Sequence, residues 1–491
     1  MYDMKPYLET IDKVIKQGPY SDTWESLSRY QVPQWYKDAK FGIFIHWGIY
    51  SVASFGSEWY SRNMYIKDSN EYKHHIETYG KHSEFGYKDL IPLFKAERFN
   101  PDEWAELFAE AGAKYVIPVA EHHDGFQMYN SEISHWNACE MGPKRDVLGE
   151  LKESCERKGI QMGASSHRVE HWFFMGHGKE FDSDIKDPME RGDFYWPAMP
   201  EPENHFDMFS EPAPTKEYLQ DWLVRCCELV DKYRPKVVYF DWWIHHSAVR
   251  PYLPKFAAYY YNRAAEWGTD AAINYKHDSF LFGSAVPDVE RGQFADVKPY
   301  FWQTCTSIAL NSWGYTENNN FRPAVDIICD MVDIVSKNGC LLLNVGPKPD
   351  GTITEEEKAV LREIGGWLKV NGEAIYGSDV WRKYGEGPTQ IVEGQFTDGI
   401  KKNFTCQDFR FTTAKSYLYA TALKCSDDGT YCIKALGDRD PSQNADYHGI
   451  IKSIQVLGGD EKLEWSRDEE GLHISGGVKR DMPIVFKIRT E

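Results

Sequence analysis

Short apolar runs alternate with amphipathic segments from about residue 35 to residue 375. The runs are rich in β-branched and aromatic residues, as buried strands are. They predict strands at 40–48, 115–123, 160–167, 237–240, 271–276, 301–308 and 340–346. The segments between them predict helices, among them 100–115, 146–158 and 215–235. Because strands separated by helices pair in parallel, residues 1–377 are expected to form an α/β fold, a (β/α)8-like, TIM-type barrel.

Two of the predicted helices begin with capping signals. Asn100 precedes Pro101, an N-cap followed by the proline that the first helical turn tolerates. Thr354 is followed three residues later by Glu357, the pattern of a capping box. We therefore expect helices to start at these two positions.

The pattern changes after Gly377, where short strand-like stretches are separated by turns. They lie at 404–414, 416–423, 430–436, 451–457, 463–468, 472–477 and 483–490. Such spacing predicts an antiparallel β-sandwich over residues 378–491. We expect this domain to support the barrel and to carry no chemistry of its own.

Composition excludes several classes of partner. The chain of 491 residues is long enough for two domains, and its formal charge of -19 argues against nucleic acid or an anionic membrane surface. No apolar run approaches the length of a membrane span, and the N-terminus has no signal-peptide pattern, which predicts a cytoplasmic protein. The ten cysteines form no CxxC motif and are expected to be reduced thiols.

The stretch VVYFDWW, residues 237–243, places Asp241 at the end of a predicted strand and before two tryptophans. In a TIM-type barrel the C-terminal strand ends carry the chemistry. His122, His123, His167 and Lys276 fall at such ends as well. Asp241 could serve there as a base, a nucleophile or a metal ligand, or it could simply cap a helix.

Metal chemistry has little support in the sequence. His122 and His123 are adjacent, and adjacent residues of a strand point to opposite faces unless the strand has ended. The chain contains no HExxH motif and no Asp/Asn-rich loop. We therefore expect neither a metal nor another cofactor.

Four segments together resemble the α-L-fucosidases of glycoside hydrolase family 29. They are WYKDAKFGIFIHWGIYSVASFGSEWY, the HHDGF of EHHDGFQMYNS, WQTCTSIALNSWGY and LLLNVGPKPDGTI. They occur in the family's order and span roughly residues 30 to 377. The resemblance implies a retaining exo-glycosidase that removes terminal α-L-fucosyl groups and needs no cofactor.

The resemblance also implies roles for individual residues. Asp241 matches the family's nucleophile, and Glu290, expected in a loop, is our choice for the acid/base, with Asp288 second and Glu317 third. Phe301 and Trp302 are expected to raise the pKa of Glu290. The implied substrate contacts are His46, Glu58, Trp59, His122, His123, His167, Tyr239, Lys276 and Trp302. Lys276 stands where the family often has arginine, and lysine lacks the bidentate fork of a guanidinium.

Two other functions are also compatible with the sequence. One is a non-catalytic fucose-binding protein on the same fold, and the other is a barrel glycosidase for a related sugar such as α-L-galactose. The expected partner is a fucosylated glycan or a small fucoside. A barrel enzyme of this size is also expected to form a homo-oligomer.

Overall fold

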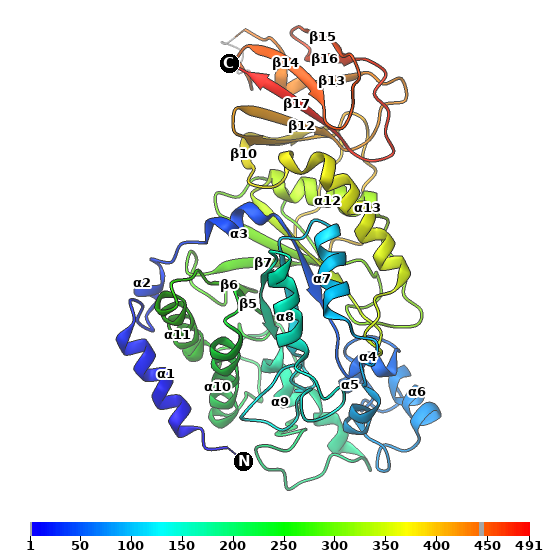
Figure 1. Cartoon of the computed structure of the whole chain (residues 1–491). Coiled ribbons are helices and arrows are strands. Elements are labelled where there is room, and N and C mark those ends of the chain that lie inside the picture. Colours follow the sequence, from blue (N-terminus) through cyan, green and yellow to red (C-terminus); the bar gives the residue numbers. More distant parts are fainter. Residues whose placement is uncertain (1, 441–445) are drawn as a thin grey trace.

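The computed structural model describes residues 2–440 and 446–491, and it places a barrel and a β-sandwich one above the other (Figure 1). Within these residues eight parallel strands form a ring, which closes because β1 pairs with both β9 and β2. The ring comprises β1 (Phe41–Ile45), β2 (Tyr115–Glu121), β4 (Ala164–Ser166), β5 (Val237–Phe240), β6 (Ala272–Tyr275), β7 (Val286–Glu290), β8 (Trp302–Ser307) and β9 (Gly339–Val345). A short strand, β3 (Gln161–Met162), also pairs with β2. The predicted barrel is confirmed.

Helices surround the ring, as the alternating pattern predicts. The longer ones are α7 (Pro101–Glu110), α8 (Val147–Arg157), α10 (Lys216–Tyr233), α11 (Leu253–Glu266), α12 (Ala324–Ser336) and α13 (Glu355–Asn371). Both capping predictions are confirmed: the Asn100 side chain accepts from the amides of Asp102 and Glu103, and the Thr354 hydroxyl accepts from the Glu357 amide. Outside the ring, α1 (Lys5–Gln17) packs on α10 and α11.

Other helices lie before β1 or in the connections between strands. They are α2 (Trp24–Leu27), α3 (Gln34–Ala39), α4 (Tyr50–Ala53), α5 (Tyr60–Asn63), α6 (Asn70–Tyr79) and α9 (His171–Phe174). Helix α3 brings Tyr36 into the buried cluster inside the ring, where its hydroxyl donates to Oε1 of Gln303 over 2.6 Å. This tyrosine therefore helps to fill the barrel interior.

Strand β7 differs from the sequence prediction, which placed Glu290 in a loop. The amino-acid composition of β7 does not indicate a strand, because Pro287, Asp288 and Glu290 are poor strand formers. The interior of the barrel compensates for the carboxylate of Asp288, which lies 2.5 Å from Nζ of Lys276 and accepts from Nε2 of Gln303 over 2.7 Å. A buried charge with such partners can be kept in a strand.

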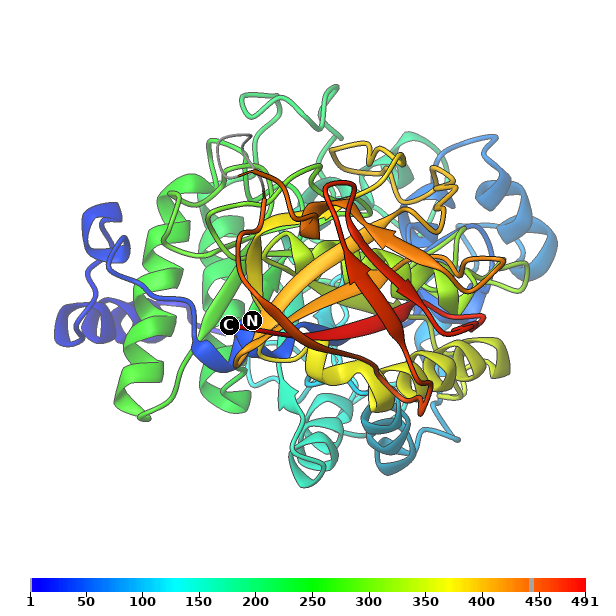
Figure 2. The same cartoon turned by 90° about the horizontal axis from the view of Figure 1, so that it is seen from above.

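The C-terminal part is an antiparallel β-sandwich, as predicted, and Figure 2 shows it from above. Its five-stranded sheet has the order β10 (Asp379–Glu386), β11 (Phe409–Ala414), β12 (Tyr417–Ala422), β17 (Ile484–Thr490) and β14 (Ile451–Val456). Its three-stranded sheet has the order β13 (Tyr431–Ile433), β16 (Leu472–Ser475) and β15 (Glu464–Arg467). The core between the sheets includes Phe409, Phe411 and Phe486.

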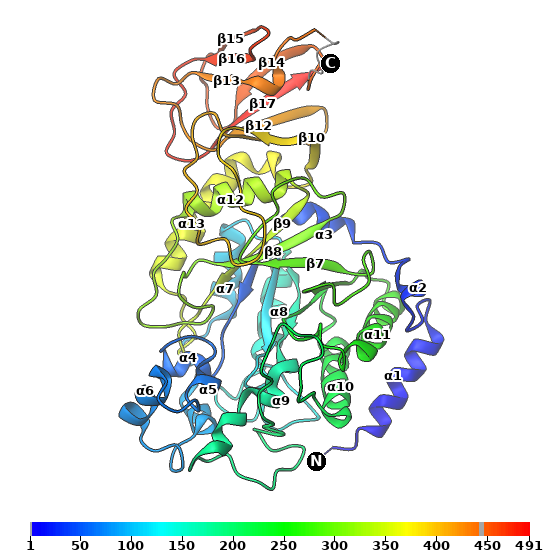
Figure 3. The ribbon, with the colours of Figure 1, turned by 180° about the vertical axis from the view of Figure 1, so that it is seen from behind.

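Buried ion pairs join the sandwich to the barrel at helix α12. Asp333 lies 2.6 Å from Nζ of Lys337 and also pairs with Arg410 of β11. Asp330 lies 2.5 Å from Arg322 and 2.5 Å from Lys402, which belongs to the connection between β10 and β11. That connection, residues 387–408, runs from the sandwich down to β7 (Figure 3).

Two sequence predictions concern the chain as a whole. All ten cysteines are unpaired, and six of them are buried. Over the described ranges, none of the helices combines the length and the apolar character that crossing a membrane requires.

Candidate active site

A cavity of about 300 Å³ opens at the C-terminal ends of the barrel strands. This volume is at the lower end of the usual range for ligand sites, so the cavity suits a small ligand. Aromatic rings, imidazoles and four carboxyl groups line it. The lining residues are Phe44, His46, Glu58, Trp59, His122, His123, His167, Glu170, His205, Phe206, Tyr239, Asp241, Trp242, Trp243, Glu290, Trp313 and Phe396.

Asp241 follows the last residue of β5 and belongs to the face of the strand that carries Val237 and Tyr239 into the barrel. Its Oδ2 lies 2.9 Å from Nδ1 of His167 and 3.5 Å from Nε2 of His123. These imidazole partners do not fit the alternative of a helix cap, which would bond backbone amides.

The two histidines keep Asp241 ionised. Burial alone favours the neutral carboxyl, but the interactions with His167 and His123 outweigh it and hold the pKa of Asp241 well below its usual value. The carboxylates of Glu170 and Asp241 overcome the burial of His123 and raise its pKa to about 9. His123 is therefore an imidazolium near neutral pH, beside an aspartate.

His167 forms a direct hydrogen bond with Asp241. Burial, the largest influence on it, lowers the pKa of His167. Its Nε2 lies 3.0 Å from the Ser165 hydroxyl. The tautomer that satisfies both contacts places hydrogen on Nδ1, which donates to Asp241, while Nε2 accepts from Ser165.

Glu290 is the last residue of β7 and faces the same cavity. Its Oε2 accepts a hydrogen bond from Nε1 of Trp242 and lies 3.3 Å from Nζ of Lys276. Burial and the negative charge of Asp241 raise the pKa of Glu290, although Lys276 opposes them. One carboxyl group is thus held ionised while a second in the same cavity is biased toward the protonated form, a division typical of acid/base and nucleophile pairs.

The other two acid/base candidates do not reach the cavity. Asp288 shares the inward face of β7 with Glu290 but lies one inward position deeper, paired with Lys276. Glu317 is exposed, and its backbone amide donates to the Ser54 carbonyl. Of these three carboxyl groups, only that of Glu290 therefore reaches the cavity, from the end of its strand.

Lys276 and Trp302 lie elsewhere than the sequence indicated. Lys276 is fully buried behind Glu290 and is outside the cavity lining. Trp302 is on the outer face of β8, where its Nε1 donates to the Lys337 carbonyl over 2.9 Å, so its expected contact with substrate is wrong. The expected effect of Phe301 and Trp302 on Glu290 is wrong as well: Phe301 packs on Tyr36 inside the barrel, and the ring beside Glu290 is that of Trp242.

Three further residues of the cavity lining are oriented by contacts with their neighbours. Nδ1 of His46 lies 2.7 Å from Oδ1 of Asn344, which assigns the hydrogen to Nδ1 and leaves Nε2 as an acceptor. Oε2 of Glu58 accepts from the Ser312 hydroxyl and the Trp313 amide, each over 2.9 Å, and so orients the carboxylate. Trp59 meets His123 edge to face at 5.7 Å.

His122 and His123 both line the cavity because β2 ends at Glu121. Ring nitrogens of His46, His122 and His167 lie within 4.8 Å of one another, close enough to share a cation. The three histidines form no local sequence motif, because they follow three different strands. The expectation that the protein needs no metal therefore stays a prediction.

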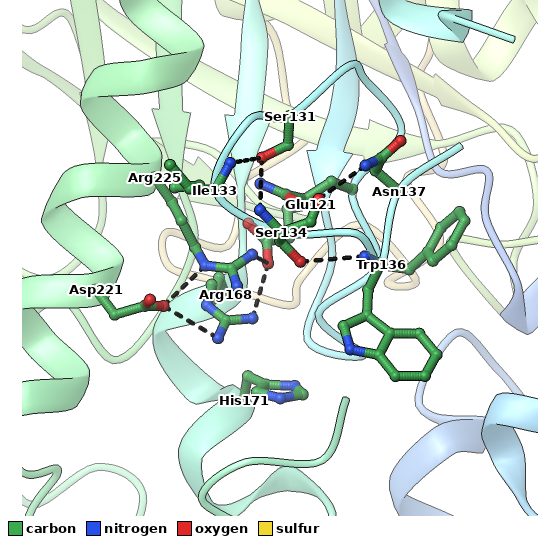
Figure 4. A network of polar contacts seen from close by, with 12 residues as sticks. Glu121, Ser131, Ile133, Ser134, Trp136, Asn137, Arg168, His171, Asp221 and Arg225 are labelled. Atoms are coloured by element: carbon green, nitrogen blue, oxygen red, sulfur yellow. Dashed lines mark hydrogen bonds and ion pairs between the residues drawn. The ribbon is translucent and has the colours of Figure 1, made fainter. Parts of the chain in front are cut away.

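A buried ion network fixes the chain next to these histidines (Figure 4). Oε1 of Glu121 lies 2.8 Å from Nη1 of Arg168 and 3.1 Å from Nη1 of Arg225. Oδ2 of Asp221, on α10, lies 2.8 Å from Nε of Arg225 and 3.3 Å from Nη2 of Arg168. Glu121 directly precedes His122, and Arg168 directly follows His167, so the network anchors both strand ends.

Sequence reasoning missed several cavity residues. Glu170 lies three residues after His167, and burial raises its pKa to about 7. Trp242 directly follows Asp241 and could have been found, since adjacency to a candidate nucleophile was a usable signal. Phe396 belongs to the connection between β10 and β11, so the prediction that the C-terminal domain only supports the barrel is too narrow.

The small cavity of this closed parallel barrel holds one carboxyl group that favours the ionised form and another that favours the protonated form. This combination is typical of a glycoside hydrolase. A family model described as alpha-L-fucosidase matches residues 8–373. The tissue alpha-L-fucosidase of Rattus norvegicus is 30% identical over 477 residues, which are 93% of this chain and 88% of that protein. The plasma alpha-L-fucosidase of Homo sapiens is 33% identical over 386 residues, 76% of this chain and 75% of that protein.

Solved structures give the same result. An alpha-fucosidase of Thermotoga maritima in complex with a mechanism-based inhibitor has a TM-score of 0.73 and 29% identity, covering 96% of this chain and 100% of that one. The same organism's enzyme in complex with fucose has a TM-score of 0.72 and 29% identity, covering 95% and 99% of the two chains. The chain belongs to the α-L-fucosidase family.

Proposed function

We propose that this protein is a retaining exo-α-L-fucosidase that acts through a covalent fucosyl-enzyme intermediate. The observation that carries the proposal is the pairing of Asp241 and Glu290 in one cavity, the first with a depressed pKa and the second with a raised pKa. Retaining glycosidases need one ionised and one protonated carboxyl group across the scissile bond.

In the first step an oxygen of Asp241 attacks the anomeric carbon of the fucosyl group, and the bond to the leaving oxygen breaks. Glu290 transfers its proton to that oxygen and becomes a carboxylate. In the second step Glu290 takes a proton from water, whose oxygen attacks the same carbon and releases Asp241. Two inversions give net retention.

The surrounding residues would bind the sugar. His46 offers a hydrogen-bond acceptor, Glu58 is held by the Ser312 and Trp313 donors, and Trp59 offers a ring face. The charge on His123 and the hydrogen bond from His167 hold Asp241 ready for attack. The cavity volume of about 300 Å³ favours a single terminal residue, and the Thermotoga maritima relative is described in complex with fucose.

Hydrolysis of 4-nitrophenyl α-L-fucoside and of the corresponding α-L-galactoside tests the proposal. We expect turnover of the fucoside, with the α-anomer of fucose released first in a proton NMR time course. If neither substrate were hydrolysed, the protein would be a binding protein and not an enzyme. Preference for the galactoside would change the assigned sugar. Release of the β-anomer first would contradict retention.

We further propose a cytoplasmic location and a homo-oligomeric state. Ten unpaired cysteines, six of them buried, support a reducing compartment. The oligomer rests on the general behaviour of enzymes of this size. Cell fractionation and light scattering test the two proposals, and a concentration-independent monomer would contradict the second.

A further inference from the structure

Three aromatic rings form a cluster at the mouth of the cavity, beside Glu290. Trp242 stacks on Phe396 with ring centroids 5.7 Å apart and an angle of 14°, and it meets Phe206 edge to face at 5.6 Å. Phe206 is 71% exposed and Phe396 is 54% exposed, yet both line the cavity. Such a group of large, exposed apolar side chains at a cavity is typical of a surface that binds a ligand.

The three rings come from three distant segments. Phe206 belongs to the long segment before α10, Trp242 follows β5, and Phe396 lies between β10 and β11 of the sandwich. Such convergence on one spot is not a consequence of local sequence. The cluster is therefore a feature of the folded molecule as a whole.

Hydrogen bonds hold the backbone around Phe396 in place, although its ring is exposed to solvent. The amide of Phe396 donates to the Glu290 carbonyl over 2.9 Å, and the amide of Asp398 donates to the Arg291 carbonyl over 2.8 Å. Nε of Arg291 lies 3.1 Å from Oδ2 of Asp398. Phe396 has φ of +57°, a left-handed conformation that is costly for a bulky residue and persists only where its surroundings impose it.

The position of Glu290 defines which part of a substrate these rings would meet. In the proposed mechanism Glu290 protonates the leaving oxygen, so the leaving group must lie on the side of the cavity next to this carboxyl group. Nε1 of Trp242 donates to Glu290, which brings the cluster to that side. The fucosyl group would then lie on the side of Asp241 and its partners His123 and His167.

We propose that Phe206, Trp242 and Phe396 form a binding site for the leaving group, and that it takes groups with a flat apolar face. The chemistry is shared by an aryl ring and by the apolar face of a pyranose, both of which stack on aromatic side chains. The proposal rests on the proposed function. It also assigns to the C-terminal domain a part in substrate choice.

Three substrates with different leaving groups test the site. α-L-Fucosyl fluoride has no leaving-group ring, 4-nitrophenyl α-L-fucoside has an aryl ring, and α-L-fucosyl-(1→2)-galactose has a pyranose. Phe396→Ala and Phe206→Ala should lower kcat/KM by about 3- to 10-fold for one or both ring-bearing substrates, the range expected from loss of an aromatic contact. The value for the fluoride should stay within about two-fold, because its leaving group reaches no ring.

Phe282→Ala is the matched control. Phe282 is 62% exposed and packs on Tyr300 with centroids 4.8 Å apart, but it does not line the cavity. It should leave all three values unchanged. Urea midpoints equal to that of the parent protein would show that the variants are folded.

The outcomes separate the subsite from the function itself. A loss with the nitrophenyl substrate alone assigns an aryl leaving group, a loss with the disaccharide alone assigns a pyranose, and a loss with both assigns the shared chemistry. Equal losses with all three substrates, or no loss with any, would overturn the subsite. If the parent protein hydrolyses none of them, the proposed function fails instead.

Discussion

The carboxyl groups of Asp241 and Glu290 are the centre of the chemistry at the scale of single residues. Their pKa values are displaced in opposite directions, downward for Asp241 and upward for Glu290. The free protein is competent when Asp241 has lost its proton and Glu290 has kept its own. Activity therefore requires a pH above the depressed pKa of Asp241 and falls as pH rises through the pKa of Glu290.

The alkaline limb of kcat/KM should respond to Lys276. Its ammonium, 3.3 Å from Glu290, lowers the pKa of that carboxyl group, so Lys276→Met should raise this pKa and move the limb to higher pH. Lys276→Arg keeps the charge and should leave the limb in place. A pH profile of each folded variant makes the comparison, and a shift to lower pH in Lys276→Met would contradict the assignment of Glu290.

Replacement of Asp241 by asparagine should abolish turnover. An amide has nearly the same shape as a carboxylate but cannot supply the nucleophilic oxygen, so kcat should fall by roughly 10³-fold or more, about 4 kcal/mol of barrier. Initial rates with 4-nitrophenyl α-L-fucoside measure the loss. Retention of a tenth of the parent rate would remove Asp241 from the mechanism.

Glu290→Ala should slow the second step more than the first. Nitrophenolate leaves without protonation, but the attacking water still needs a base, so the fucosyl-enzyme should accumulate and both kcat and KM should fall. Azide needs no base and should restore the rate with α-fucosyl azide as product. Glu317→Ala, which alters an exposed carboxylate outside the cavity, is the control and should behave as the parent. Normal turnover of Glu290→Ala with a poor leaving group would assign the acid/base elsewhere.

Alternation along strands explains which site residues the sequence could indicate. Val237, Tyr239 and Asp241 fall on one face of β5, so the inward position of Asp241 follows from its spacing. The same rule applied to β8 places Phe301, Gln303 and Cys305 inside and Trp302 outside, which the sequence argument overlooked. Phe396 could not be predicted, because nothing in its own segment indicates that it reaches a cavity in the other domain.

At the scale of secondary-structure elements, the network of Glu121, Arg168, Asp221 and Arg225 links β2, the segment after β4 and helix α10. All four side chains are buried, so the loss of one arginine leaves two carboxylates sharing a single guanidinium in a medium of low polarity. The elements that carry His122 and His167 depend on one another through these charges.

Arg168→Met should lower the free energy of unfolding by about 3–5 kcal/mol, the cost of breaking a buried ion pair from one side. It should also lower activity, because Arg168 is bonded directly to His167 along the chain. Urea unfolding measures the first effect and fucoside hydrolysis the second. Arg157→Met removes an exposed partner of Asp102 and should leave the urea midpoint nearly unchanged. Equal midpoints for both variants would show that the network does not stabilise the fold.

Most elements of the barrel could be predicted, because apolar strands and capped helices follow local rules. Strand β7 could not, since its inward face carries Asp288 and Glu290, whose partners, among them Lys276, come from other segments of the barrel. A pattern based on hydrophobicity reads such a strand as a loop. The exception thus occurs where the interior of the barrel is polar.

At the scale of the whole molecule, barrel and sandwich share buried charges. Asp333 of α12 is fully buried between Lys337 and Arg410, and Asp330 lies between Arg322 and Lys402. Each carboxylate has one cationic partner from the barrel and one from the C-terminal part. We therefore expect the two parts to unfold together.

Arg410→Met should destabilise the entire protein by about 3–5 kcal/mol in a single transition, because Asp333 loses a buried partner. Arg489→Met alters an exposed residue of the same sheet and should have little effect. Tryptophan fluorescence and far-UV circular dichroism follow the transition in urea. Separate transitions, with the barrel keeping the parent midpoint, would show that the interface does not couple the two parts.

The shared charges also bear on how the chain is made. Ribosomes synthesise α12 before Lys402 and Arg410, so for a time Asp330 and Asp333 have only their barrel partners. The barrel cannot reach its final stability while these partners are still missing, although N-terminal parts of proteins generally fold first. Completion of the barrel is therefore delayed until Lys402 and Arg410, in the last quarter of the chain, have been translated. A message truncated after α13 would yield a barrel with unpaired buried carboxylates, a product suited to capture by chaperones and proteases.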